Sequence, residues 1–265
     1  MKPSEIKTIL AEIGASPARS RGQNFLIDEK LADRQIEYAR LSSEDIVLEV
    51  GPGLGVLTKR LAASANKVIA IETDAKLASY LLNNLPPNVE LIKDDALDVE
   101  FPIFNKFVSN LPYSISSPII FKLLENSFER GVVMLQKEFA DRMVALPGGK
   151  NYSRLTVNVY YRAECRILEN VSSSCFWPAP RVDSAVVELV PRAPPFHVKD
   201  EKFFFHLVEL LFQNRRKKIG TILKMRSLIT AEQRMQLPYV DDRVETLVPE
   251  QIGELSDKVI ELRTS

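Results

Sequence analysis

The stretch that decides the fold is Ile46 to Gly55, IVLEVGPGLG, in which a short β-branched run ends in a glycine-rich turn. The run predicts a buried strand over Ile46–Val50, closed by Gly51, and residues with helical spacing follow over Leu54–Ala63. Glycines at such a turn let the backbone approach a ligand closely, and the helix N-terminus offers free N–H groups to an anion. The spacing is GxGxG, whereas dinucleotide-binding folds usually show GxGxxG. The stretch indicates a nucleotide pocket, with a tight turn that binds no ligand as the alternative.

The same alternation of strands and helices continues on the C-terminal side of this stretch. Apolar runs predict strands at Val68–Glu72, Val89–Lys93, Phe107–Asn110 and Val132–Gln136. Helices are predicted at Ala75–Leu85 and Pro118–Asn126, with Thr73-Asp74 and Ser116-Ser117 as candidate N-caps. A late apolar run at Ser184–Val190 fits a last strand inserted into the sheet. The pattern predicts an α/β, Rossmann-like parallel sheet that binds its ligand at the carboxyl ends of the strands.

The composition changes after residue 190, where Pro191, Pro194 and Pro195 fall within five residues and suggest a linker. The segments beyond it read as helices without strand signal, at Phe203–Phe212, Arg215–Leu228 and Pro249–Leu262. We therefore expect an α/β domain over residues 1–190 and a small all-helical C-terminal domain over residues 191–265.

Acidic residues stand at the ends of the second and third predicted strands. Glu72 ends the second strand, where a carboxylate would accept hydrogen bonds from ribose hydroxyls. Asp95 follows the third strand, where it could accept the amino hydrogens of an adenine. Either residue alone could be a helix N-cap. Together with the turn at Gly51 and Gly53, they predict a pocket for an adenosine-containing cofactor.

The fourth strand ends in Asn110-Leu111-Pro112-Tyr113, and this turn favours S-adenosylmethionine over a nicotinamide cofactor. An exocyclic amine on adenine is a poor nucleophile because its lone pair is delocalised into the ring. The Asn110 side-chain oxygen and the Leu111 carbonyl could accept its two hydrogens and favour a localised lone pair as the transition state forms. Pro112 would stiffen the turn, and Tyr113 offers a stacking face. The alternative is a proline turn whose asparagine caps the following helix.

A base buried in a duplex cannot reach such a pocket, so we expect a single-stranded or flipped-out target. Aromatic stacking would offset the cost of unstacking, at about 1–3 kcal/mol per base. Tyr113 is one predicted face and Phe176 the other, because two prolines that follow would hold it in a rigid loop. Core packing is the alternative role for Phe176, and Trp177 is a less favoured stacking residue.

Positive charge gathers in one segment although the formal net charge is zero. The segment lacks acidic residues and contains Arg215, Arg216, Lys217, Lys218, Lys224 and Arg226. A solvated helix face would explain it, but we favour phosphate binding because of the pocket predicted in the other domain. Arg19 and Arg21 form a second, weaker basic stretch.

The 265-residue chain is 45% hydrophobic and 26% charged, an ordinary composition for a folded protein. It has no apolar run of about 18 residues for a membrane span and no secretory core at its N-terminus. Cys165 and Cys175 form no CxxC motif, and His197 and His206 form no ligand cluster, so we expect no metal. The low cysteine count fits a reducing cytosol, and we expect a cytoplasmic protein.

Four motifs together resemble the ribosomal RNA adenine dimethyltransferases whose loss gives kasugamycin resistance. They are QNFL at residues 23–26, EVGPGLG at 49–55, NLPY at 110–113 and FWPAPRVDS at 176–184; Phe212–Lys218 extends the likeness into the helical domain. The resemblance implies dimethylation of two adjacent adenines in a loop near the 3′ end of small-subunit rRNA. It implies S-adenosylmethionine contacts at Asn24, Leu26, Gly51, Glu72, Asp95 and Asn110.

The resemblance also implies that the substrate is a partly assembled small ribosomal subunit and that the protein serves in the biogenesis of that subunit. The helical domain would grip rRNA through Arg215, Arg216, Lys217 and Lys218. We expect a monomer that has no membrane partner.

Three alternatives stay open at this point. The nearest is a macrolide-resistance methyltransferase, which resembles this family but modifies one adenine of large-subunit rRNA. A non-catalytic ribosome-assembly or transcription factor on the same fold is the second, although the intact Asn110–Tyr113 turn argues against it. A nicotinamide oxidoreductase is the third, and the GxGxG spacing speaks against it.

Overall fold

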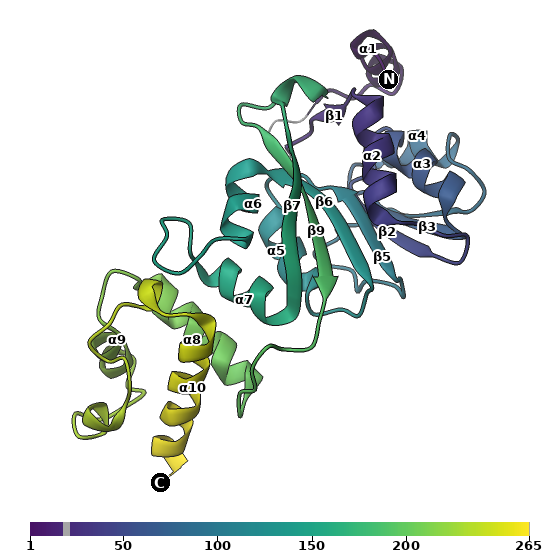
Figure 1. Ribbon diagram of the computed structural model, residues 1–265. Coiled ribbons are helices and arrows are strands. Elements are labelled where there is room, and N and C mark those ends of the chain that lie inside the picture. Colours follow the sequence, from purple (N-terminus) through teal and green to yellow (C-terminus); the bar gives the residue numbers. More distant parts are fainter. Residues whose placement is uncertain (18–21, 265) are drawn as a thin grey trace. The chain divides into compact units, whose positions relative to one another are not determined.

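The computed structural model describes residues 1–17 and 22–264, so Arg19 and Arg21 lie outside the described residues (Figure 1). The chain divides into two compact units. Unit 1 comprises Met1–Ala140 and Glu164–Pro191, and unit 2 comprises Asp141–Ala163 and Arg192–Ser265. Within the described ranges, no helix combines the length and the apolar character that crossing a membrane requires.

Unit 1 contains the expected α/β sheet. Among the described residues its strands lie in the order β4 (Val89–Ile92), β3 (Lys67–Ile71), β2 (Ile46–Val50), β5 (Lys106–Asn110), β6 (Arg130–Gln136), β9 (Ser184–Pro191) and β7 (Ala163–Val171). The first five are mutually parallel, and β9 runs antiparallel to β6 with Met134 opposite Val186. The five predicted strands and the inserted last strand are confirmed. The edge strand β7 was not predicted, because its half-exposed sequence AECRILENV shows no apolar run.

Helices α2 (Glu29–Ala39) and α3 (Val56–Ser64) pack on each other and on one face of this sheet (Figure 1). Leu31, Leu57 and Leu61 from these helices join strand residues such as Val108 and Val132 in a buried cluster. The other helices of unit 1 are α1 (Pro3–Glu12), α4 (Ala75–Leu82) and α5 (Ser116–Leu123), and the chain leaves the unit within α6 (Lys137–Met143).

Two of the predicted N-caps have different outcomes. Asp74 caps α4 and accepts hydrogen bonds from the backbone N–H groups of Lys76 and Leu77. Ser116 is instead the first residue of α5, where its hydroxyl donates to the Pro112 carbonyl at 3.2 Å. The serine therefore ties α5 back to the preceding turn and does not cap the helix.

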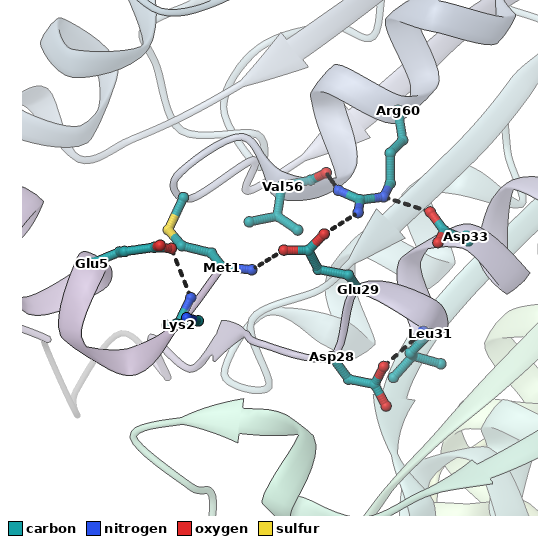
Figure 2. A network of polar contacts seen from close by, with 9 residues as sticks. All are labelled: Met1, Lys2, Glu5, Asp28, Glu29, Leu31, Asp33, Val56 and Arg60. Atoms are coloured by element: carbon teal, nitrogen blue, oxygen red, sulfur yellow. Dashed lines mark hydrogen bonds and ion pairs between the residues drawn. The ribbon is translucent and has the colours of Figure 1, made fainter.

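Polar contacts fix the position of α2 relative to α1 and α3 (Figure 2). Asp28 caps α2 by accepting from the Leu31 N–H at 3.1 Å. Arg60 of α3 donates to Asp33 and Glu29 at 2.7 and 3.0 Å, and Glu29 also pairs with the Met1 ammonium at 2.6 Å. These contacts hold α2, which packs against β5 and β6.

A second, two-stranded sheet joins segments that are far apart in the sequence. β1 (Phe25–Leu26) pairs antiparallel with β8 (Phe176–Trp177), and a 3₁₀ turn, η2 (Ser173–Cys175), precedes β8. This pairing brings the QNFL motif beside the loop that contains Phe176. Neither strand was predicted, because a two-residue strand leaves no periodic signal.

Unit 2 is helical, and its elements are α7 (Arg154–Arg162), α8 (Glu201–Gln213), α9 (Ile219–Met225), α10 (Pro249–Thr264) and the 3₁₀ turns η3 (Gln233–Gln236) and η4 (Val244–Thr246). The expected division at residue 190 misplaces Asp141–Ala163, which belongs to this unit. The reason is packing: Tyr161 of α7 contacts the rings of Phe196, Phe204 and Phe205 at 5.1–5.3 Å between centroids.

The predicted helix Arg215–Leu228 was also wrong in its start. Its helical part is α9, Ile219–Met225, and Lys218 is the N-cap residue. The basic residues before it form a turn after α8, in which Lys217 N–H donates to the Asn214 carbonyl at 2.8 Å. Their side chains are therefore not arranged around a helix.

Candidate active site

A cavity of about 280 Å³ lies at the carboxyl edge of the parallel sheet in unit 1. The last residues of β2, β3 and β5, namely Val50, Ile71 and Asn110, all line it. The predicted site residues in its wall are Asn24, Gly51, Gly53, Glu72, Asp95, Asn110, Leu111, Pro112, Tyr113 and Phe176. The structure thus brings together residues from six separate segments of the sequence.

The glycine-rich turn lies directly against the Asn110–Tyr113 turn. Gly51 has φ +74°, and a Cβ at this position would lie 3.2 Å from Cδ of Pro112. Glycine adopts this left-handed conformation at no steric cost, and the absence of a Cβ leaves room for the proline. The close approach fixes the distance between the predicted cofactor turn and the predicted catalytic turn.

Glu72 is buried in the cavity wall and is held by backbone donors. Its two carboxylate oxygens accept from the Gly53 N–H at 3.3 Å and from the Asp74 N–H at 2.8 Å. Burial raises the pKa of this carboxyl above its usual value. A carboxylate has about four lone-pair sites, so two bonds orient Glu72 and leave acceptor capacity for hydroxyl groups.

Asp95 both caps a turn and lines the cavity. Its Oδ1 accepts from the Leu97 N–H at 2.9 Å within a turn, and no helix begins there, so the helix N-cap interpretation of Asp95 is wrong. Lys122 of α5 secures the same turn, because its Nζ donates to the carbonyls of Ala96 and Leu97 at 2.9 and 3.2 Å. Asp94 lines the cavity as well and was not predicted as a site residue.

The Asn110–Tyr113 turn presents two acceptor groups with different surroundings. Oδ1 of Asn110 accepts a hydrogen bond from Nε2 of Gln35 at 2.7 Å. Asn110 does not cap the following helix, since α5 has Ile115 at its N-cap position. No described residue donates to the carbonyl oxygen of Leu111, whereas its N–H donates to Met134 at 3.2 Å. Sequence reasoning did not select Gln35, the hydrogen-bond partner of Asn110.

The two predicted stacking residues both reach the cavity. The Tyr113 hydroxyl lies 2.6 Å from the buried Ser184 hydroxyl at the start of β9, and burial raises the Tyr113 pKa. Phe176 is 6% exposed, so it packs in the core and also forms part of the wall. Trp177 does not line the cavity; its ring lies beneath Lys7, whose Nζ is 5.5 Å from the ring centroid.

Leu26 lies outside the wall of the main cavity. It lines a smaller cavity of about 50 Å³ that shares Asn24, Gly51 and Asn110 with the main one. Glu49 lines the small cavity too, and burial raises the pKa of its carboxyl to about 8, with the Glu72 carboxyl adding to the shift. Sequence reasoning did not select Glu49 as a site residue, although Glu49 begins the EVGPGLG motif.

The predicted RNA-binding residues of unit 2 are not equivalent. Arg215 pairs with Glu245 at 2.7 Å, and Lys218 pairs with Asp241 at 3.3 Å. Arg216 and Lys217 are exposed, and neither has an acidic partner among the described residues. Among these four residues, the positive charge without a described acidic partner therefore lies on Arg216 and Lys217.

Comparison with known proteins identifies the family. The model of the ribosomal RNA adenine dimethylase family matches residues 16–260. The chain belongs to the ribosomal RNA adenine dimethylase family. A curated relative from Methanosarcina acetivorans, named probable ribosomal RNA small subunit methyltransferase A, is 49% identical and aligns over 91% of this chain and 93% of its own length.

Two solved structures with substantial sequence identity have the same fold. A dimethyladenosine transferase from Plasmodium falciparum superposes with TM-score 0.75 at 32% identity, covering 87% of this chain and 95% of that one. The 23S rRNA methyltransferase ErmE superposes with TM-score 0.68 at 31% identity, covering 89% and 100%.

As a member of the dimethylase family, the chain is an rRNA adenine dimethyltransferase, and its cofactor is S-adenosylmethionine. The nicotinamide oxidoreductase alternative is thereby excluded, as is a non-catalytic role as the sole function. The individual residue roles stay predictions.

Proposed function

We propose that this chain dimethylates the exocyclic amino groups of two adjacent adenines in a 3′-terminal loop of small-subunit rRNA. The names of the curated relatives, small subunit methyltransferase A, support this choice of ribosomal subunit. The observation that carries the chemistry is the position of the Asn110–Tyr113 turn, which lines the cavity in direct contact with the glycine-rich turn.

The cavity fits the cofactor of the family in its donor and acceptor groups. Glu72, oriented by two backbone N–H groups, would accept from the ribose hydroxyls, and Asp95 would accept from the adenine amino group. The remaining predicted contacts are Asn24, Leu26, Gly51, Gly53 and Asn110. When bound, S-adenosylmethionine supplies an electrophilic methyl group that needs no further activation.

The chain's own contribution to the reaction is the placement and polarisation of the target amine. The Asn110 side-chain oxygen and the Leu111 carbonyl would each accept one amino hydrogen, which favours a localised nitrogen lone pair. Preorganised acceptors are effective because they do not have to reorient as charge develops. Tyr113 and Phe176 would stack on the flipped base. The nitrogen–methyl bond would form as the sulfur–methyl bond breaks, and the amine would then release its proton to water.

We propose that unit 2 binds the rRNA backbone through Arg215, Arg216, Lys217 and Lys218, whose charges complement phosphate. We also propose that the substrate is a partly assembled small subunit and that the chain acts on it as a monomer in the cytoplasm. The exposure of Arg216 and Lys217 supports a role in phosphate binding for these two residues first.

The test is methyl transfer from labelled cofactor to small and large ribosomal subunits that lack the modification. We expect label in small-subunit rRNA, with mass mapping that locates two adjacent dimethylated adenines in a 3′-terminal loop. The likeness to ErmE makes large-subunit rRNA the competing substrate. Label in large-subunit RNA alone would overturn the choice of substrate, and label in neither would contradict the catalytic proposal.

A further inference from the structure

Gln35 is a polar side chain in an otherwise apolar interface between α2 and the sheet. It is fully buried, and Leu31, Ala32 and Ala39 of the same helix are buried with it. Burying a carboxamide is unfavourable unless its polar atoms find hydrogen-bond partners. Nε2 donates to Oδ1 of Asn110 at 2.7 Å, whereas Oε1 has no partner in the described part of the chain.

This arrangement is costly for stability alone. An apolar side chain of similar length would fill the same space and would leave no buried carbonyl without a donor. The single bond that Gln35 makes goes to the side chain at the centre of the catalytic turn, 75 positions away in the sequence. A role for the contact with Asn110 would explain why a side chain that is unfavourable to bury stands at position 35.

We propose that Gln35 is a positioning residue that orients the Asn110 carboxamide for methyl transfer, an inference that rests on the proposed function of Asn110. A carbonyl oxygen carries two lone pairs. Gln35 occupies one of them from the core side and so fixes the plane of the carboxamide. The second lone pair stays available to the adenine amine that enters from the cavity, which Asn110 also lines.

Replacing Gln35 with methionine tests the role of the bond, because Met has a similar length and no N–H donor. Without this donor, the Asn110 carboxamide can rotate about its terminal torsion. Its oxygen then points toward the target amine in only a fraction of the molecules. We expect kcat of Gln35→Met to fall roughly tenfold, the range of one net hydrogen bond. The KM for RNA and the affinity for S-adenosylmethionine should stay within about threefold.

A matched control lies one helical turn earlier. Leu31 is fully buried on the same helix and has no polar side-chain atom. Leu31→Met disturbs the same interface without touching the bond, so its kcat should stay within about twofold of wild type. Thermal unfolding of both variants checks that each is folded at the assay temperature. A Gln35→Met kcat within about twofold of wild type, or an equal loss in Leu31→Met, would overturn the proposal.

A pH profile of Gln35→Glu separates positioning from packing. A protonated glutamic acid can donate to Asn110 Oδ1, whereas the ionised carboxylate cannot. Burial raises the pKa of such a carboxyl, so the change of state falls within an accessible pH range. We expect the kcat ratio of variant to wild type to fall as pH rises. A flat ratio, or one that rises with pH, contradicts the observed direction of the hydrogen bond.

The side-chain amide signals give a readout that does not depend on turnover. The Gln35 amide protons should be protected from solvent exchange in the wild type, and this protection should fall in Asn110→Ala. Unchanged protection contradicts the proposal even if neither ribosomal subunit is methylated. Methyl transfer by the wild type together with an unaltered Gln35→Met rate contradicts this inference alone and leaves the proposed function intact.

Discussion

The predicted catalytic turn Asn110–Tyr113 and the basic segment Arg215–Lys218 are held in opposite ways. In the turn, buried partners fix the polar side chains: Gln35 binds Asn110 at 2.7 Å, and Ser184 binds Tyr113 at 2.6 Å. In the segment, Arg215 and Lys218 form ion pairs, whereas Arg216 and Lys217 are exposed and have no acidic partner among the described residues. A preorganised group acts through its geometry, so single-atom changes matter greatly, whereas exposed charges act additively and are screened by salt.

The largest effect should come from removing the side chain at the centre of the turn. We expect Asn110→Ala to lower kcat by about 10²- to 10³-fold, comparable to the loss of one preorganised group of an oxyanion hole. The measurement is single-turnover methyl transfer to unmodified small subunits at saturating cofactor.

The control for this variant is cofactor affinity by calorimetry. Asn110 is one of several predicted cofactor contacts, and the glycine-rich turn, Glu72 and Asp95 are unchanged, so the affinity should fall far less than kcat, by at most about tenfold, the net worth of one hydrogen bond. Turnover within tenfold of wild type would place the catalytic acceptor elsewhere and would remove the contrast between the two regions.

The buried carboxyl of Glu49, which lines the small cavity, also predicts that the free energy of unfolding depends on pH. The pKa of Glu49 is raised from 4.5 to about 8 in the folded chain, mainly by burial. Between these values the folded protein keeps a proton that the unfolded chain releases, so this group lowers the free energy of unfolding as pH rises. For one proton the slope is at most about 1.4 kcal/mol per pH unit.

Glu49→Gln should remove this slope, because glutamine does not titrate. Urea unfolding at several pH values between 5 and 8, for the wild type and the variant, measures the difference. The neighbouring Glu72 contributes to both proteins, so the difference isolates Glu49. Equal slopes in the two proteins would show that Glu49 is ionised in the folded state.

The parallel sheet and most of the cavity wall could be predicted from the sequence because their signals are local. Apolar runs that end in glycine, acidic residues or NLPY mark strand ends, and parallel strands bring their carboxyl ends to one edge. Gly51 and Pro112 illustrate this, since each is required by the backbone at its own position and the fold places them in contact.

Features that depend on distant partners could not be predicted in the same way. Gln35 resembles any polar residue on an amphipathic helix, and its partner lies 75 positions away. The ion pairs of Arg215 and Lys218 involve residues 30 and 23 positions further along the chain. Asp141–Ala163 joins unit 2 through the aromatic contacts of Tyr161, which no local periodicity reveals.

A smaller effect is expected at the edge of the catalytic turn. Ser184→Ala removes the partner of the Tyr113 hydroxyl and should raise the KM for RNA by up to about tenfold, the net worth of one hydrogen bond. Tyr113→Phe keeps the stacking ring and removes the same bond. In a double-mutant cycle the combined variant should cost no more than either single one. Additive losses would mean that the two hydroxyls act independently.

The smallest effects should come from the basic segment, and they should depend on salt. Each phosphate contact contributes about 0.7–1 to the slope of log K against log salt concentration. Arg216→Ala and Lys217→Ala should each reduce this slope by such an amount and weaken small-subunit binding several-fold. Arg215→Ala and Lys218→Ala serve as matched controls, because Arg215 pairs with Glu245 and Lys218 pairs with Asp241, a carboxylate that Arg234 also contacts, and we expect their slopes to change by less. Equal changes at all four positions would mean that the ion pairs break when RNA binds and that all four side chains contribute to phosphate binding.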